Sequence, residues 1–380
     1  MTDTGLVLSG GGARAAYQVG AISALTELLK PTTTPFSVLA GVSAGAINST
    51  ALACRADDFP RATRELRETW LSLTPDAVYR TDGPKLALLG ARWLRDLTTG
   101  GALTHARVNH LLDTAPLREM LSRRIEVARI PHLVENNLLR GVALSVTNYL
   151  TGTNVTFFDA TTAVKPWLRH DRVAFRARLS IEHIMASSAI PLFFPPVSID
   201  GKIFGDGGMR MTTPLSPAIH LGATKVVAIG IRHARTPQQT LELNRGGTSE
   251  QVSVAQIGGV LLNALFLDAL DNDVERLQRI NRTLSMIPST ANTASPDRLR
   301  PIPALLLRPS QDLGRLAADE YSKFPALLRH LLRGIGATRS SGWDLLSYLA
   351  FLPPYVAKLM ELGYDDTYRR RNEIVAFMDS

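Results

Sequence analysis

Two glycine-rich turns near the start of the chain hold the residues best suited to chemistry. One of them, residues 41–45 (GVSAG), has the G-x-S-x-G spacing of a nucleophile elbow. In such an elbow the serine sits at the tip of a sharp strand-to-helix turn, and Gly41 and Gly45 lack the Cβ atoms that would clash there. An apolar run over residues 36–40 precedes the turn. We therefore predict that Ser43 is a nucleophile; the alternative is an ordinary turn with a solvent-facing serine.

The other turn, residues 9–14 (SGGGAR), also follows a short apolar run. Its three consecutive glycines offer backbone N–H groups at the start of a helix, which is an anion-binding arrangement. One interpretation is an oxyanion hole for acyl transfer. The rival is a dinucleotide-binding turn, because the spacing also fits G-x-G-x-x-A. That rival needs an acidic residue after the second strand, and none occurs between Glu27 and Asp57, so the spacing disfavours it.

A serine nucleophile needs a base, and Asp206 is the candidate that the sequence offers. It lies between Gly205 and Gly207, shortly after the turn at Asp200-Gly201. Flexible backbone on both sides would let its carboxylate approach a serine hydroxyl closely. The alternative is that Asp206 only completes a turn, where Asp-Gly pairs are common.

These blocks, taken with residues 186–196 (ASSAIPLFFPP), resemble the patatin-like phospholipase family over about residues 4–232. The resemblance implies a dyad without histidine, in which Ser43 is the nucleophile and Asp206 the general base. Ala15 departs from the family, which has glycine after the Arg/Lys of the first turn. The resemblance further implies an oxyanion hole of Gly10, Gly11, Gly12 and Arg14, with elbow and dyad support from Gly41, Gly45, Gly207 and Gly208.

The alternation of strands and helices predicts an α/β fold. We expect a three-layer α/β/α architecture with a mostly parallel central sheet, as in the patatin-like family. The predicted catalytic domain spans residues 1–232 and contains a helical insertion at about 55–135. A mainly helical C-terminal extension, residues 233–380, is expected to pack on this core. Within it, residues 304–307 (ALLL) read as one more strand.

Composition excludes several classes of protein and of binding site. The 380 residues are 45% hydrophobic and 20% charged, as in a globular protein, and the formal net charge is +8. The single cysteine, Cys54, excludes an internal disulfide framework and a cysteine zinc site. No basic cluster is interleaved with aromatic residues, so we expect no nucleic-acid partner. The acidic residues near 268–275 read as a solvated helix face, and we expect neither a metal nor a cofactor.

Two apolar segments suggest contact with lipid. Residues 85–94 and 345–360 each fit a lid or a membrane-touching helix as well as a core helix. The first residues lack the basic region of a signal peptide, and no uninterrupted apolar stretch is long enough to span a bilayer. We therefore expect a cytoplasmic protein with peripheral membrane contact. The sequence leaves a homo-oligomer open.

The resulting prediction is a lipid acyl hydrolase that cleaves carboxylic esters of phospholipids or other lipids through an acyl-enzyme on Ser43. Two alternatives remain. One is a Ser-His-Asp carboxylesterase or thioesterase, since His220, His233 and His330 follow Asp206 in the chain order that such a triad requires. The other is a lipid-binding module without catalysis.

Overall fold

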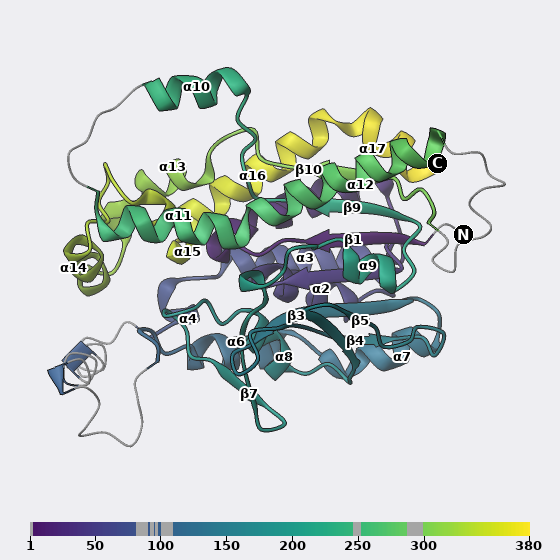
Figure 1. Ribbon diagram of the computed structural model, residues 1–380, viewed down its shortest axis with the longest axis horizontal. Coiled ribbons are helices and arrows are strands. Elements are labelled where there is room, and N and C mark those ends of the chain that lie inside the picture. The colour runs from purple at the N-terminus through teal and green to yellow at the C-terminus, as the bar shows by residue number, and fades with distance from the viewer. Residues whose placement is uncertain are drawn as a thin grey trace.

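The structure, a computed structural model, describes residues 3–80, 90–91, 95, 98–99, 109–245, 252–286 and 299–380. The apolar segment at 85–94, a predicted lid or membrane-touching helix, therefore falls almost entirely outside the described residues. Figure 1 shows a central sheet enclosed by helices, with α10 (Pro237–Arg245) standing apart from the other helices.

Within the described ranges, one sheet of ten strands runs through the molecule in the order β10-β9-β1-β2-β3-β4-β6-β5, with β8 also paired to β3 and β7 to β8. The strands are β1 (Thr4–Leu8), β2 (Val38–Val42), β3 (Gly141–Asn148), β4 (Asn154–Ala160), β5 (Leu168–Arg169), β6 (Arg172–Arg176), β7 (Val197–Ile199), β8 (Lys202–Asp206), β9 (Lys225–Ile229) and β10 (Ala304–Leu307).

The sheet is mixed, with a parallel half and a largely antiparallel half. Strands β10, β9, β1, β2 and β3 are parallel neighbours, which confirms the predicted parallel core and the predicted strand at 304–307. Beyond β3 the pairs β3–β4, β3–β8, β7–β8 and β5–β6 are antiparallel. Short hairpin loops join several of these pairs, and a short loop permits only an antiparallel return.

Helices cover both faces of the sheet, as a parallel sheet requires. Leu6 and Leu8 of β1 belong to the larger apolar core, whereas Val7 belongs to a smaller core on the opposite face. The helices are α1 (Ala16–Leu29), α2 (Ala44–Ala53), α3 (Phe59–Leu71), α4 (Pro75–Val78), α6 (Ala115–Arg124), α7 (Ile130–Glu135), α8 (Ile181–Ser187), α9 (Ser216–His220), α11 (Val254–Phe266), α12 (Asp268–Met286), α13 (Leu313–Ala318), α14 (Ala326–Gly334), α15 (Trp343–Leu349), α16 (Pro353–Arg369) and α17 (Arg371–Asp379).

Local sequence explains where several helices begin. Helix α3 starts after Asp58, whose carboxylate accepts a hydrogen bond of 3.0 Å from the Arg61 amide. Helix α8 starts at Ser180, which forms a capping box with His183. Such caps satisfy backbone N–H groups that have no partner inside the helix. His183 therefore caps helix α8. Its ring also lies edge-on to the ring of Phe157.

A close crossing of α1 and α16 joins the C-terminal region to the core. A Cβ atom on Gly20 would lie 1.9 Å from the carbonyl oxygen of Met360, and one on Gly363 would lie 2.0 Å from that of Tyr17. The two helix backbones therefore touch, and each needs glycine at the contact. The Tyr17 hydroxyl also donates a hydrogen bond to Asp366 across the same interface.

Replacing Gly363 with alanine should separate these helices and destabilise the protein. We expect a loss of about 1–3 kcal/mol, because overpacking a close contact costs that much. Chemical unfolding of the purified protein measures it. Gly334→Ala is the matched control, since a Cβ there meets nothing within 4 Å. Equal stability of the two variants would contradict the close crossing.

Candidate active site

Ser43 occupies the strand–turn–helix context that the G-x-S-x-G motif predicts. It follows β2 and precedes α2, with a φ of 56° that a non-glycine residue rarely adopts. A Cβ on Gly45 would lie 2.2 Å from the carbonyl oxygen of Leu8, and one on Gly41 would lie 2.3 Å from that of Gly45. The two glycines let β1, β2 and α2 approach closely enough to hold the serine in this strained turn.

Ser187 and Ser188 hold the elbow in place, although no motif predicts a role for them. The Ser43 amide donates to Oγ of Ser187 at 3.0 Å, and Ser187 in turn donates to the carbonyl oxygen of Ser145 on β3 at 2.7 Å. Oγ of Ser188 donates to the carbonyl oxygen of Ser43 at 3.1 Å. All of these groups are buried. The Ser-Ser pair in the 186–196 block was the only sequence signal for this support.

Asp206 lies at the end of β8 and is buried next to Ser43. Its Oδ1 accepts a hydrogen bond of 2.9 Å from the Gly208 amide, whereas its Oδ2 makes no hydrogen bond within the described residues. Burial raises the pKa of Asp206 from 3.8 to about 7, and the Ser43 hydroxyl and the Gly208 amide oppose this rise. The structure thus brings the two predicted dyad residues together, with one carboxylate oxygen left without a partner.

The first glycine turn lies against the nucleophile. A Cβ on Gly10 would lie 2.8 Å from Cβ of Ser43, and Gly11 and Gly12 both have positive φ angles, of 151° and 57°. Among the described residues, the amides of Gly11 and Gly12 are not used in a hydrogen bond. This arrangement leaves backbone donors beside the serine, as an oxyanion hole needs.

The ion-pair and hydrogen-bond partners of Arg14 lie outside the predicted oxyanion hole. Its guanidinium group is buried and forms an ion pair of 2.8 Å with Asp344. It also donates to Oγ of Ser347 at 2.7 Å and to Oδ1 of Asn263 at 3.1 Å, and it lies over the ring of Tyr348. These partners belong to α11 and α15, far away in sequence. Arg14 therefore joins the glycine turn to the C-terminal region, and its part in an oxyanion hole stays a prediction.

The candidate site is closed. Ser43 is 1% exposed and Asp206 is fully buried. A Cβ on Gly208 would lie 2.3 Å from the ring of Phe266, so the last residue of α11 covers the dyad. The apolar segment at 345–360 forms α15 and the start of α16, and it lies in the buried core beside the glycine turn.

A small apolar cavity of about 30 Å³ touches Ser43. Its walls come from α2, α3, α4, α6, the 186–196 block and Phe351. No sequence motif predicts this lining, which is made of side chains such as Trp70, Leu117 and Phe194. An apolar wall next to the nucleophile would suit an acyl chain once the site opens.

The histidines of the alternative triad lie elsewhere. His220 stacks on Trp167, and His233 hydrogen-bonds to the carbonyl oxygen of Pro309. No histidine in the described part of the chain hydrogen-bonds to Ser43 or Asp206. The geometry therefore favours Asp206 as the direct partner of Ser43.

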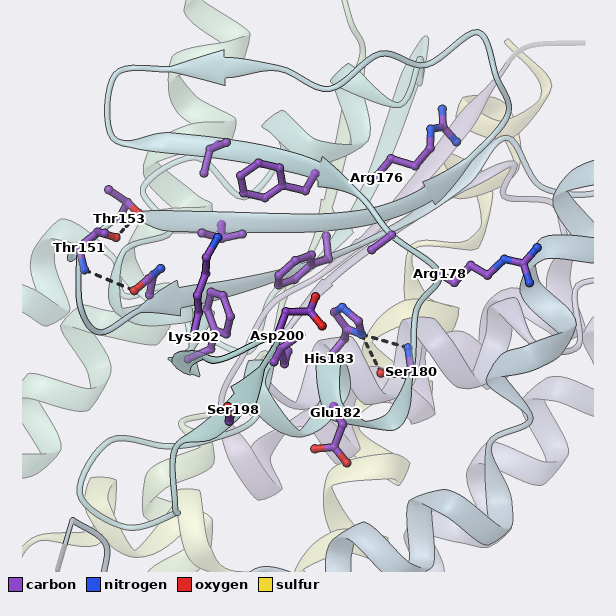
Figure 2. Close-up of a pocket in the computed structure, with 18 residues that line it drawn as sticks. Thr151, Thr153, Arg176, Arg178, Ser180, Glu182, His183, Ser198, Asp200 and Lys202 are labelled. Atoms are coloured by element: carbon purple, nitrogen blue, oxygen red, sulfur yellow. Dashed lines mark hydrogen bonds between the residues drawn. The ribbon is translucent and has the colours of Figure 1, made fainter. Parts of the chain in front are cut away.

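A second, larger cavity of about 840 Å³ is shown in Figure 2. Strands β4 and β6, the β7–β8 hairpin and the start of α8 form it, and neither Ser43 nor Asp206 lines it. Figure 2 shows His183 turned toward Ser180. Over the described residues, no group of three His, Cys, Asp or Glu side chains is placed to hold a metal ion.

Comparison with known proteins identifies a family for this chain. The sequence matches the model of the patatin-like phospholipases over residues 6–219. A cGAMP-activated phospholipase of Pseudomonas aeruginosa (strain BWHPSA011 / Pa011) is 26% identical over 314 residues, which cover 79% of this chain and 81% of that protein.

Two solved structures are similar at low sequence identity. VipD from Legionella pneumophila has a TM-score of 0.38 and 14% identity over 98% of this chain and 67% of its own. Human GIVD cytosolic phospholipase A2, solved with a fluorophosphonate inhibitor, has a TM-score of 0.41 and 12% identity over 100% of this chain and 59% of its own.

The chain belongs to the patatin-like phospholipase family, because the family match covers more than half of its length. Membership of this family makes it a lipid ester hydrolase.

The buried carboxyl group of Asp206 should make stability depend on pH. Its folded-state pKa lies above its ordinary value of 3.8, so between about pH 4 and 7 the folded chain keeps a proton that the unfolded chain loses. Stability should therefore fall as pH rises through this window. Asp206→Asn removes the charge, so its stability relative to wild type should rise by about 2–3 kcal/mol between pH 5 and pH 8.

Urea unfolding at the two pH values measures this difference. Asp319→Asn, at an exposed carboxylate, is the control and should change little at either pH. An Asp206→Asn effect of the same size at pH 5 and pH 8 would show that Asp206 is not a buried titrating group.

Proposed function

We propose that the protein is a serine acyl hydrolase of phospholipids, with Ser43 as nucleophile and Asp206 as its general base. The observation that carries this proposal is the unpartnered Oδ2 of a fully buried Asp206 next to Ser43. A pKa near 7 suits a residue that must take up and return a proton at neutral pH. The elbow, the glycine turn and the family membership support the same chemistry.

In this mechanism Asp206 takes the proton of the Ser43 hydroxyl while Oγ attacks the ester carbonyl carbon. The amides of Gly11 and Gly12 donate hydrogen bonds to the oxyanion that forms. Collapse of this intermediate breaks the bond to the alcohol, which leaves with the proton from Asp206. Water, deprotonated by Asp206, then attacks the acyl-enzyme. The fatty acid leaves, and the proton returns to Ser43.

The apolar lining at Ser43 supports a fatty acyl chain as the group that is transferred. The structure constrains the polar head group of the substrate less than its acyl chain. We propose that the substrate is a phospholipid or lysophospholipid rather than a short soluble ester. Because phospholipids reside in bilayers, the protein is expected to act in peripheral contact with a membrane.

The closed site implies an opening step before hydrolysis. Ser43 and Asp206 have almost no exposed surface, so a lipid cannot reach them in the arrangement described. The 26% identical relative is named for activation by cGAMP. The hydrolysis assay therefore has arms with and without cGAMP, as well as arms with and without vesicles.

Ser43→Ala should reduce fatty-acid release to background, because no other group supplies the nucleophile. Asp206→Asn should reduce it on the order of 10²–10⁴-fold, the usual contribution of a general base. Release is measured from phosphatidylglycerol vesicles, from a lysophospholipid and from a short-chain p-nitrophenyl ester. The matched controls are Ser122→Ala and Asp319→Asn, both at exposed side chains that do not line the cavity at Ser43.

Two results would contradict the dyad. A folded Asp206→Asn variant with near wild-type rate would remove Asp206 from the chemistry. A hydrolysis rate that falls as far in His220→Ala or His233→Ala as in Asp206→Asn would favour the triad alternative.

The pH dependence of the rate should follow the protonation of Asp206. Below its pKa the general base is protonated, so kcat/KM should fall about tenfold per pH unit below about pH 7 and level off above it. The profile is measured with the soluble ester, whose own charge does not change. A plateau that extends unchanged down to pH 5 would show that the base titrates as an ordinary carboxylate.

A further inference from the structure

Helix α11 has an outer face that is apolar and exposed. Val254, Ile257, Val260 and Leu261 are each more than half exposed, and their spacing places them on one side of the helix. We call these four residues the α11 outer face. No charged residue occurs between Glu250 and Asp268. Scattered exposed apolar residues are normal on a protein surface, but a contiguous stripe without charge indicates a binding surface.

Positively charged residues lie at the N-terminal end of this helix. The Ala255 amide donates a 2.9 Å hydrogen bond to the carbonyl oxygen of Ile335, directly after α14, and a Cβ on Gly342 would touch Ala255. Arg333 and Arg339 lie close to these contacts in sequence and are exposed. Between Glu320 and Asp344 the chain has four basic residues and no acidic one: Lys323, which forms an ion pair with Glu320, and Arg329, Arg333 and Arg339.

The inner face of the same helix closes the active site. Leu262 and Phe266 are buried, and Phe266 lies against both Gly10 and Gly208, which flank the dyad. Asn263 accepts hydrogen bonds of 3.1 Å from Arg14 and from the Tyr348 hydroxyl. In Figure 1, α11 and α12 lie end to end across the upper part of the molecule, with α14 next to the start of α11. The outer face therefore belongs to the same helix that covers the active site.

This helix is suited to lie on a bilayer rather than to cross it. By length and composition alone, the helical stretch 254–286 is apolar enough to span a membrane. However, its inner side packs on the protein, and the acidic residues Asp268, Asp271 and Asp273 follow directly. An amphipathic helix with an apolar face and basic neighbours binds at the interface of an anionic membrane.

We propose that the α11 outer face docks on the surface of an anionic lipid bilayer and so brings the dyad to its substrate. This inference rests on the proposed function, since it assigns the lipid surface as the partner of the same site. The missing charge on α11 excludes a highly polar partner, and the excess of basic residues beside it matches anionic headgroups. A second copy of the chain would place these basic residues against one another if the two-fold axis ran through the patch.

The test measures vesicle binding by sedimentation, with vesicles of phosphatidylcholine alone or mixed with phosphatidylglycerol. All proteins carry Ser43→Ala, so that hydrolysis does not alter the vesicles. The double variant Ile257→Asp/Val260→Asp should bind mixed vesicles at least tenfold more weakly, because two apolar side chains no longer enter the interface. Arg333→Gln should weaken binding to mixed vesicles about fivefold and leave binding to pure phosphatidylcholine unchanged.

A matched control carries the same two added charges elsewhere. Leu150→Asp/Leu168→Asp changes two exposed apolar residues, in the turn after β3 and in β5, and should bind vesicles as the parent does. The double variant is also made with Ser43 intact. It should keep its melting temperature and its rate on the soluble p-nitrophenyl ester, while its rate on mixed vesicles falls with binding.

Unchanged vesicle binding by the double variant would overturn the proposal. So would a dimer of the parent that the double variant breaks without losing vesicle binding, because the face would then belong to a second copy. The two proposals fail separately. If the Ser43→Ala protein binds vesicles through this face but the protein with Ser43 hydrolyses no ester, the docking surface stands and the proposed function fails.

Discussion

The structure depends on keeping one carboxyl group, that of Asp206, out of water beside a serine. Burying a charged carboxylate without a full set of hydrogen-bond partners costs free energy, and this cost raises the pKa of Asp206. The surrounding elements make it possible: β3 and β8 pair at Asp206, the Thr147 hydroxyl holds its carbonyl oxygen at 2.8 Å, and the Gly208 amide holds Oδ1. The strain at Ser43 is maintained in the same way, by Ser187 and Ser188.

The C-terminal region completes this environment. Phe266 of α11 covers Gly10 and Gly208, and the carbonyl oxygen of Tyr348 would meet a Cβ on Gly12 at 2.2 Å. Arg14 ties the glycine turn to Asp344, and α16 lies in backbone contact with α1. The helices after β9 therefore exclude water from the dyad, and the helix that seals it presents the α11 outer face to solvent. Helix α11 therefore covers the dyad with one face and exposes the other face to solvent.

Local features of this molecule could be predicted from sequence, whereas contacts between distant segments could not. The elbow around Ser43 and the turn around Asp206 are specified by glycines within a few residues, and the parallel core follows from buried strands that alternate with helices. Ser187, Phe266 and the partners of Arg14 lie more than 100 residues after the elbow and the glycine turn that they contact, and no periodicity encodes these contacts. In the antiparallel half, the hairpin-like pattern of residues 148–158 and the turn at Asp200-Gly201 indicate the pairs β3–β4 and β7–β8, whereas no local pattern indicates β5 and β6, which are short and partly exposed.

Labelling of the nucleophile tests the central claim most directly. An alkyl fluorophosphonate reacts only with an activated serine, and mass spectrometry of the digested protein locates the adduct. We predict one adduct, on Ser43, whose rate of formation rises with pH up to about 7 and is slower by orders of magnitude in Asp206→Asn. Equal labelling of Ser43 in the wild type and in Asp206→Asn, or an adduct on another serine, would contradict the account.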